Sequence, residues 1–572
     1  MFRPGLKALK MNLKQIPVYR RGWWSVFRSL KAFMPVCLGV LVVAASVWLP
    51  APEAKAAGSF LMGGDVSMLH EIEQLGGKFH DNNVEKDALQ ILADHGMNAV
   101  RLRLWVDPYD SQGNPYGGGT NDLPTTIALA QRAKALGMKV LLNLHLSDFW
   151  ADPGKQTKPK SWQNLTYGQL LTAVYNYTNS VITQMKSAGA LPDMVQVGNE
   201  ISSGILWDDG KVGGGNDDFT QLGELLKSAI NGIKAALSPG ENIEIVLHLD
   251  HGGDHNLYAW WFDKIEAEGV DYDIIGLTYY PFWHGTMGEL AYNLNALVNR
   301  YGKDVMIVET AYAFTLADGD GLGNSFYTAE ESIGGYPASL AGQTAYLRDL
   351  KEIVADVPNN RGRGIFWWEP IWLPVPGANW GTEAGKQYNN DTGLLSNPWD
   401  NMTLFDFNGH LLPTVSVFTE PVPGNVVANP SFEADGWTTA PSGWNRWAAN
   451  SDSMSAIKVE NNGLTGSFKL THWKDTAYEV STYQTITGLS NGTYTLSAWV
   501  LNSGGQNTVH LYAKHYGGPE RNVDLPVSPV KWVKVKIENI QVTNGQIEIG
   551  VYSDANACTW MNLDHVKLYK TS

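Results

Sequence analysis

MVQVGNE, residues 194–200, is a mostly apolar run that ends in a glycine, an amide and a carboxylate. The stretch VMIVET, residues 305–310, has the same form, because its apolar residues are followed directly by Glu309. Apolar runs of this length are typical of parallel strands that are buried on both faces of a sheet. We therefore expect Glu200 and Glu309 to lie at the same edge of a parallel sheet, where its strands end.

Further apolar runs alternate with amphipathic helical stretches from Phe60 to about Val417. The expected strands are 60–64, 99–105, 139–144, 194–198, 243–249, 274–278, 305–308 and 364–368. The expected helices include 87–95, 125–136, 167–187, 219–237, 287–301 and 344–355. Eight such alternations over roughly 350 residues predict an α/β fold of the (β/α)8 TIM barrel type. A doubly wound open sheet is the alternative, but no G-x-G-x-x-G follows an early strand.

The composition changes near residues 412–424, where Pro413, Pro421 and Pro423 indicate a short, stiff linker. Beyond it, strand-like runs are separated by Gly, Asn and Asp, which predicts an all-β jelly-roll sandwich. These runs are 467–472, 483–487, 493–500, 508–513, 530–535, 546–552 and 565–569. The expected domains are therefore a barrel at 57–417, a linker at 418–426 and a sandwich at 427–572.

Residues 1–56 have the pattern of a secretory signal peptide. They are basic up to Lys31, contain no acid before Glu53, and carry an apolar run at 32–49. Ala54-Lys55-Ala56 then forms an A-x-A site with cleavage expected before Ala57. We expect an extracellular protein that does not contact the membrane after cleavage, with a retained membrane anchor as the alternative. Met1 and Met11 both remain possible starts.

Charge and composition exclude some classes of partner. The net charge of −15 argues against binding to nucleic acid and, more weakly, against an anionic polymer. The 22 tryptophans and 59 glycines suit a loop-rich extracellular protein with aromatic contact surfaces. Cys37 belongs to the signal peptide, so Cys558 has no intrachain partner in the mature chain and is interpreted as a core residue.

Two acids at the mouth of a barrel suit the hydrolysis of a glycoside. That reaction needs one carboxylic acid held protonated and one carboxylate held ionised. Either glutamate alone would be interpreted more simply as part of a salt bridge at a strand end. The presence of both at strand ends favours a catalytic role. Arg101 and Arg103 alternate on the second strand, so one of them is expected to face the mouth and keep the nucleophile ionised.

Aromatic and polar residues gather after the other strand ends, as a sugar site requires. Sugars present C–H faces to aromatic rings and hydroxyls to polar side chains. The candidate contacts on these grounds are Arg103, His145, Trp150 and Trp368. A zinc site is the competing chemistry, but no H-E-x-x-H or C-x-x-C links the histidines. A serine hydrolase is disfavoured because no G-x-S-x-G occurs.

Seven ordered stretches resemble glycoside hydrolase family 53, the arabinogalactan endo-β-1,4-galactanases of clan A. The resemblance spans nearly all of residues 58–417. The stretches are GGDVSMLHEIE from residue 63, VRLRLWVDP from 100, DFWADPGKQ from 148, DMVQVGNEIS from 193, LHLDHGGD from 247, IIGLTYYPFWHGT from 274 and IVETAYAFTLADGDG from 307.

The resemblance implies cleavage of β-1,4-galactan or arabinogalactan with retention of configuration. Glu200 would be the acid/base and Glu309 the nucleophile, while Asn199 would bond the sugar 2-OH and Tyr279 would orient Glu309. Candidate substrate contacts by the same resemblance are Asp152, Lys155, His248, Asp254, Tyr312 and Trp368. Two alternatives remain open: another clan A endo-glycanase acting on mannan, xylan or cellulose, and a catalytically silent galactan-binding protein. We expect a monomer.

Bacterial members of this family carry a structural calcium ion between the loops after strands seven and eight, and no organic cofactor is expected. The matching ligands would be Asp320, the Leu322 carbonyl, Asn324, Asn397 and Asp400. Oxygen ligands at alternating positions suit this hard cation. A glycine-rich turn with solvated acids is the alternative. Asn397 departs from the family, in which a serine is more usual at this position.

The C-terminal region resembles carbohydrate-binding module family 61, which binds β-1,4-galactan. The resemblance lies in Asn429-Pro-Ser-Phe-Glu433 and Asn562-Leu-Asp564. Residues that could form its binding site are Trp447, Trp473, Tyr512, His515, Arg521 and Trp532, although sandwich cores also use tryptophan. Whether Glu433 and Asp564 hold a second calcium ion is left open.

Overall fold

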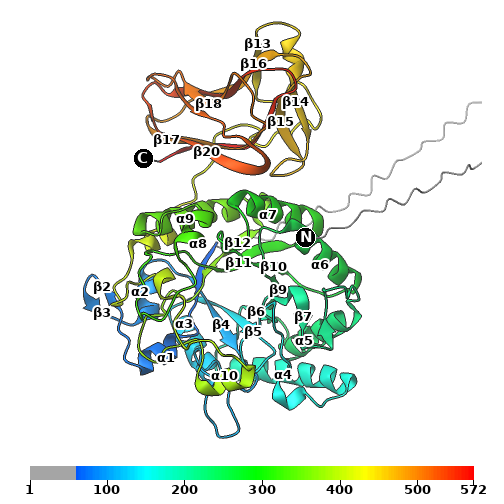
Figure 1. Ribbon diagram of the computed structural model, residues 1–572, viewed down its shortest axis with the longest axis vertical. Coiled ribbons are helices and arrows are strands. Elements are labelled where there is room, and N and C mark those ends of the chain that lie inside the picture. Colours follow the sequence, from blue (N-terminus) through cyan, green and yellow to red (C-terminus); the bar gives the residue numbers. More distant parts are fainter. Residues whose placement is uncertain (1–59, 572) are drawn as a thin grey trace, which may run out of the picture. The chain divides into compact units, whose positions relative to one another are not determined.

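The computed structural model describes residues 60–571, and the predicted signal peptide at 1–56 lies outside them. Eight parallel strands close into a barrel in the order β1-β12-β11-β10-β9-β6-β5-β4 (Figure 1). The strands are β1 (Leu61–Asp65), β4 (Ala99–Leu104), β5 (Lys139–Leu144), β6 (Met194–Val197), β9 (Glu244–Leu249), β10 (Ile274–Thr278), β11 (Asp304–Thr310) and β12 (Gly362–Trp367). The predicted (β/α)8 barrel is confirmed.

Helices surround the outside of the barrel (Figure 1). The main ones are α2 (Ala88–Asp94), α3 (Leu123–Ala135), α4 (Tyr167–Ser187), α5 (Thr220–Ala235), α6 (His255–Ala267), α7 (Met287–Tyr301) and α9 (Leu340–Ala355). Shorter elements in the loops are α1 (Leu69–Gln74), α8 (Thr328–Gly334), α10 (Glu383–Asn389), α11 (Ser416–Thr419) and the hairpins β2 (His80–Asp81) with β3 (Val84–Glu85) and β7 (Gly204–Ile205) with β8 (Gly210–Lys211). Among the described residues, no helix has the length and apolar character needed to cross a membrane.

The interior of the barrel is apolar at one end and polar at the other. The apolar cluster takes residues from all eight strands: Leu61, Ala99, Leu141, Met194, Val246, Ile274, Met306, Val308 and Phe366. Side chains two residues apart on a strand point to the same side. The next inward positions are therefore polar on four strands: Arg101 on β4, Asn143 on β5, Gln196 on β6 and His248 on β9; on β1, Asp65 follows Gly63 on the same side. This polar layer supports the mouth of the barrel.

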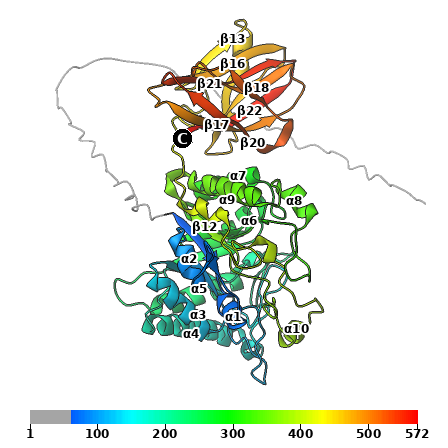
Figure 2. The same ribbon diagram turned by 90° about the vertical axis from the view of Figure 1, so that its left-hand side faces the viewer.

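The C-terminal region consists of two five-stranded antiparallel sheets (Figure 2). One has the order β13-β16-β21-β18-β19 and the other β14-β15-β22-β17-β20. The strands are β13 (Asn445–Ala448), β14 (Ile457–Asn461), β15 (Phe468–Trp473), β16 (Tyr478–Thr487), β17 (Gly492–Asn502), β18 (Thr508–Lys514), β19 (Arg521–Asp524), β20 (Ser528–Val542), β21 (Gln546–Ala555) and β22 (Trp560–Lys570). Side chains of both sheets, such as Leu470 and Leu511, share one apolar core, which is the sandwich that the sequence predicts.

Candidate active site

Glu200 lies three residues after the end of β6 in a left-handed backbone conformation, with φ of +48°. Non-glycine residues in this region are strained and concentrate at functional sites. The hydroxyl of Thr278, at the end of β10, donates a 2.7 Å hydrogen bond to Glu200 Oε1. His248 Nε2 lies 2.7 Å from Thr278 Oγ1, and its Nδ1 accepts from Glu200 N–H at 3.3 Å. The neutral Nε2–H form of His248 satisfies both bonds.

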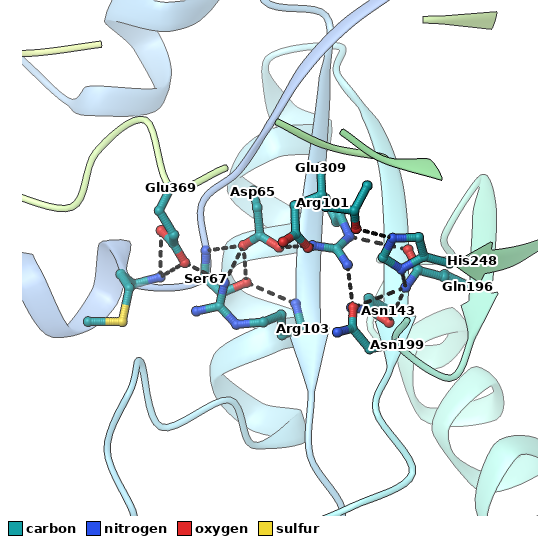
Figure 3. A network of polar contacts seen from close by, with 12 residues as sticks. Asp65, Ser67, Arg101, Arg103, Asn143, Gln196, Asn199, His248, Glu309 and Glu369 are labelled. Carbon is teal, nitrogen blue, oxygen red and sulfur yellow. Dashed lines mark hydrogen bonds and ion pairs between the residues drawn. The ribbon is translucent and has the colours of Figure 1, made fainter. Parts of the chain in front are cut away.

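Glu309 lies on β11, in quite different surroundings. Its Oε2 forms an ion pair with Arg101 Nη1 at 3.1 Å, and its Oε1 accepts a 3.0 Å hydrogen bond from the Tyr280 hydroxyl. Arg101 also donates to Asp65 Oδ2 at 2.9 Å and to Asn199 Oδ1 at 2.7 Å (Figure 3). Because every donor around Glu309 favours its ionised form, this carboxyl group is arranged to act as an anion.

The two glutamates therefore differ in electrostatics. Burial raises the pKa of Glu200 well above its ordinary value, and the negative charges of Glu309 and Asp250 raise it further. Burial also raises the pKa of Glu309, but Arg101 and the hydrogen bond from Tyr280 lower it. Coupled carboxyl groups separate into one protonated and one ionised member. The geometry assigns the proton to Glu200.

Both glutamates line one cavity of about 240 Å³ that is walled largely by tryptophan. Its remaining lining residues are Trp150, Ala151, Asp152, Lys155, Asn199, Trp368, Trp372, Trp380, Pro398 and Trp399. A cavity with aromatic walls and two carboxyl groups in opposite states can hold a sugar ring and cleave its glycosidic bond.

A family model for glycosyl hydrolase family 53 matches residues 61–418 of the chain. The chain belongs to glycosyl hydrolase family 53. A curated relative, "Endo-beta-1,4-galactanase" of Bacillus subtilis, is 38% identical over 386 residues, which cover 64% of this chain and 87% of the relative. The chain is thus a glycoside hydrolase, and its barrel is the part that carries the family.

Two solved structures are similar to this chain. The family 53 catalytic domain of Ignisphaera aggregans is 45% identical, with a TM-score of 0.59, covering 63% of this chain and 95% of that one. A structure from a study of two fungal beta-1,4-galactanases is 31% identical, with a TM-score of 0.52, covering 64% of this chain and 100% of that one.

The structure brings five of the expected substrate contacts to the cavity. They are Trp150, Asp152, Lys155, Asn199 and Trp368. Trp372 and Trp380 join them from the loop after β12, where the sequence places a group of tryptophans. Trp399 was missed by the sequence analysis. It lies in the segment that was interpreted only as a metal-binding loop.

The expectation that Tyr279 orients Glu309 is wrong. The Tyr279 hydroxyl donates to Gly285 O at 3.0 Å, and the ring is fully buried. Tyr280 bonds Glu309 instead. The physical reason is the alternation of side chains along a strand. Ile274 and Thr278 point into the barrel, so Tyr280, two positions after Thr278, points to the same side.

Five other expected contacts lie outside the cavity lining. Arg103, His145, His248 and Tyr312 are each 1% exposed or less. Burial lowers the pKa of His145 and of His248 well below the ordinary value, so both are neutral. Tyr312 bonds Tyr336 O at 2.6 Å. Asp254 caps α6 by accepting from Leu257 N–H at 3.1 Å. These positions leave His248 as a support for Glu200, not a sugar contact.

The loops after β11 and β12 bring acids together. Carboxylate oxygens of Asp318, Asp320 and Asp400 lie within 4.8 Å of one another. Asp400 Oδ1 and Asn324 Oδ1 are buried without a hydrogen-bond partner. Burial raises the pKa of Asp400 to about 6. The side chain of Asn397, unlike those of Asp400 and Asn324, has partners for both of its polar atoms. Its amide N–H donates to Trp372 O at 2.7 Å and its Oδ1 accepts from Trp399 N–H at 3.1 Å.

A second groove, of about 480 Å³, crosses the sheet that contains β13, β16, β18 and β21. Its lining residues are Trp447, Ser481, Tyr483, His510, Tyr512, Lys514, Glu520, Glu548 and Tyr552. Trp447 is 45% exposed, and Lys514 pairs with Glu548 at 3.1 Å. Of the residues suggested by the sequence, Trp447 and Tyr512 line this groove, whereas Trp473 and Trp532 belong to the other sheet.

Proposed function

We propose that the protein is an endo-β-1,4-galactanase that hydrolyses the β-1,4-galactosidic bonds of galactan and arabinogalactan with retention of configuration. The observation that carries the proposal is the opposite environment of the two glutamates in one aromatic cavity: a cation and a phenol hydroxyl at Glu309, and neither at Glu200. The names of the family 53 relatives support galactan as the polymer.

In the first step, Glu309 attacks the anomeric carbon while Glu200 donates its proton to the glycosidic oxygen. The carbon–oxygen bond to the departing chain breaks, and a galactosyl ester of Glu309 forms. Arg101 and Tyr280 hold the Glu309 carboxylate in place for this attack. Asn199 donates one amide hydrogen to Ala151 O at 2.9 Å, and its second amide hydrogen would bond the sugar 2-OH.

In the second step, Glu200 is ionised and acts as a base. It removes a proton from a water molecule, whose oxygen attacks the anomeric carbon and releases Glu309. Glu200 regains its proton and the sugar leaves with its original configuration. The hydrogen bond from Thr278 to Glu200 Oε1 supports the ionised state between the two steps.

The substrate class is tested by reducing-sugar release from linear β-1,4-galactan, with mannan, xylan and cellulose in parallel. We expect hydrolysis of galactan alone by the wild type, and a loss of kcat of at least about 100-fold in Glu309→Ala and Glu200→Ala. Hydrolysis of another polymer alone would support the alternative of a different clan A endo-glycanase. A lack of activity on all four would support a galactan-binding protein.

The two roles are separated by azide rescue of these variants on an aryl β-galactobioside. Azide enters the space left by the nucleophile in Glu309→Ala, so the product is the α-glycosyl azide. In Glu200→Ala the glycosyl ester still forms and azide replaces water, which gives the β-glycosyl azide. Exchange of the two products would reverse the assigned roles, and β-azide from both variants would contradict Glu309 as nucleophile.

We also propose a structural calcium ion between the loops after β11 and β12. The unpartnered buried oxygens of Asp400 and Asn324 support it, because calcium binds carboxylate and amide oxygens. Asp318 and Asp320 would complete the acidic part of the site, with the Leu322 carbonyl as a further ligand. Asn397 would act mainly through its bonds to Trp372 and Trp399.

The calcium proposal is tested by thermal unfolding with and without chelator. We expect EDTA to lower the Tm of the wild type by several degrees, and excess calcium to restore it while magnesium does not. Asp400→Asn should be insensitive to both treatments, whereas Asp391→Asn, a partly exposed acid of the preceding segment, should respond like the wild type. An identical Tm of the wild type with and without EDTA would contradict the proposal.

The C-terminal sandwich is proposed as a galactan-binding module. The support is the groove on the β13–β19 sheet, where Trp447 offers an exposed ring and the Lys514–Glu548 pair offers hydrogen-bonding groups to sugar hydroxyls. A module of this kind keeps the enzyme near an insoluble polymer by raising its effective concentration.

Secretion and a monomeric state complete the proposed function. The basic start, apolar run and A-x-A site of residues 1–56 support export with cleavage before Ala57. Mass spectrometry of the exported protein should give an N-terminus at Ala57. Light scattering should give the mass of a single mature chain, and a retained N-terminus or a multiple of that mass would contradict this part.

A further inference from the structure

Arg103 has a different environment from Arg101, although both are buried inside the barrel. Its guanidinium forms ion pairs through Nη1 with Asp65 Oδ1 at 2.8 Å and with Glu369 Oε1 at 2.5 Å. None of these three side chains is more than 1% exposed. Two carboxylates thus fix the position of one cation, which lies behind the cavity lining and is not part of it.

Two tryptophans cover the guanidinium of Arg103. The Cζ atom lies 4.8 Å from the ring centroid of Trp150 and 4.7 Å from that of Trp368. The two indole rings lie 6.1 Å apart and are tilted by 53° to each other. Both also line the cavity that holds Glu200 and Glu309. A cation at this distance from a ring attracts it, so Arg103 fixes the inner faces of two cavity walls.

Trp368 depends on this contact more than Trp150 does. Trp150 Nε1–H donates to Trp380 O at 2.7 Å, whereas Trp368 Nε1 is buried without a hydrogen-bond partner. The backbone of Trp368 is held by a 2.7 Å bond from its N–H to Thr310 O. The ring itself has only packing and the two arginines, of which Arg101 is farther away at 5.6 Å.

Glu369 follows Trp368 and turns back beneath it. Its φ is +42°, a strained left-handed conformation for a residue with a side chain. The carboxylate accepts from Met68 N–H at 3.2 Å, in the loop after β1. Burial raises the pKa of Glu369, and the ion pair with Arg103 opposes that rise by stabilising the charged carboxylate. The strained turn brings the charge of Glu369 to Arg103.

Asp65 connects the two arginines (Figure 3). Its Oδ2 accepts from Arg101 at 2.9 Å, and its Oδ1 accepts from Arg103 at 2.8 Å. Arg101 leads to the nucleophile Glu309, and Arg103 leads to the tryptophan walls. The nearest cavity-side partner of Arg101 is therefore Glu309, whereas Arg103 lies nearest to the two tryptophans, so changes at each arginine should affect mainly different kinetic constants.

We propose that Arg103, anchored by Glu369 and Asp65, is a positioning residue that holds Trp150 and Trp368 as the aromatic walls against which the sugar binds beside the catalytic glutamates. The inference rests on the proposed galactanase function and adds a residue that acts on sugar binding without touching the sugar. Because the planar guanidinium stacks on flat rings, a lysine ammonium is not equivalent at this position.

The test compares Arg103→Met with Arg363→Met, a matched control at the opposite end of the barrel strands. Arg363 lies at the start of β12 and pairs with Glu244 and Asp304, both at 2.9 Å or less. On linear galactan, we expect Arg103→Met to raise KM about tenfold while kcat changes less than about threefold. Arg363→Met should leave KM unchanged. Arg103→Lys should restore less than half of the lost affinity.

A spectroscopic measurement separates wall positioning from general destabilisation. Tryptophan fluorescence is titrated with β-1,4-galactotriose in the Glu200→Gln background, so that no turnover occurs. We expect the response of this background to be reduced and shifted to about tenfold higher ligand concentration when Arg103→Met is added. Addition of Arg363→Met should leave it unchanged.

The single variant leaves Glu369 without its cation, which can prevent folding. The double variant Arg103→Met/Glu369→Gln removes that charge and gives the same test. Unchanged KM and unchanged fluorescence response in a folded Arg103 variant would overturn the proposal. So would a fall in kcat at constant KM with a displaced acid limb of the pH profile, since that result assigns Arg103 to Glu309. Inactivity of the wild type on galactan would instead contradict the galactanase function itself.

Discussion

At the scale of single residues, the neighbouring tyrosines Tyr279 and Tyr280 offer a test of the site. Tyr280 donates to the nucleophile, whereas Tyr279 bonds Gly285 O inside the barrel wall. We expect Tyr280→Phe to lower kcat on galactan about 10- to 100-fold, because it removes a hydrogen bond to a charged group. Tyr279→Phe should stay within about twofold of the wild-type kcat. Equal effects of the two changes in steady-state kinetics would contradict this distinction.

The pH profile is expected to respond in opposite directions to two changes near Glu200. Activity requires protonated Glu200, so it falls as the pH rises through the Glu200 pKa. The Thr278 hydroxyl stabilises the ionised form, and Thr278→Val should therefore raise this pKa and move the alkaline limb upward. The charge of Asp250 disfavours the ionised form, so Asp250→Asn should move the limb downward.

Each of these shifts in the alkaline limb should be about 0.5 to 1 pH unit, and kcat/KM against pH on galactan measures them. Asp271→Asn is a suitable control, because this acid pairs with Lys234 at the protein surface. Shifts of the same sign in Thr278→Val and Asp250→Asn would show that Glu200 does not govern the alkaline limb.

The sequence predicts the catalytic pair but only part of its surroundings. Glu200 and Glu309 follow apolar strands, which is a local signal. The partners of Glu309 come from β4 and from the residue after Tyr279, so they depend on which side of each strand faces inward. The alternation of inward-pointing side chains from Ile274 to Thr278 would have identified Tyr280 as the tyrosine that faces Glu309. The role of Arg103 depends on Glu369, more than 260 residues later, and spacing alone does not show such a pair.

At the scale of elements, the barrel strands were predictable because each is a continuous buried run with few polar residues. The sandwich was less so. Strands β13, β14 and β19 were missed, and each lies at the edge of a sheet. An edge strand such as Asn445–Ala448 is partly exposed along its length and lacks a clear apolar period. The three strands have only 4, 5 and 4 residues, so each offers too few apolar positions to establish a period.

Helix α4 offers a prediction about local stability. Thr166 and Gln169 form a reciprocal capping box at its start. We expect Thr166→Ala to lower the free energy of unfolding by about 1 kcal/mol, because the backbone N–H of Gln169 in the first turn loses its acceptor. Thr172→Ala, an exposed mid-helix change in α4, should be neutral or slightly stabilising. Urea unfolding followed by circular dichroism compares the two, and equal losses would contradict a specific role for the cap.

At the scale of the whole molecule, the described residues contain two separate grooves that suit sugars, and they differ in chemistry. The barrel cavity combines tryptophan walls with Glu200 and Glu309, whereas the groove on the sandwich combines Trp447 with a neutralised Lys514–Glu548 pair. A neutralised pair can bond hydroxyls but lacks the protonated and ionised carboxyl groups that cleavage requires. If the sandwich binds galactan as proposed, cleavage and retention on the polymer are separable functions of one chain.

This separation predicts a substrate-dependent effect of Trp447→Ala. Removal of the exposed ring should weaken retention on insoluble galactan and lower the rate on that substrate about three- to tenfold, because the effective concentration of enzyme at the polymer falls. The rate on soluble galacto-oligosaccharides should not change, since the barrel is untouched. Trp473→Ala, an exposed tryptophan on the other sheet that is 38% exposed, serves as the matched control. Pull-down with insoluble galactan and rates on both substrates measure the difference, and equal retention of the two variants would place the galactan-binding face elsewhere on the sandwich.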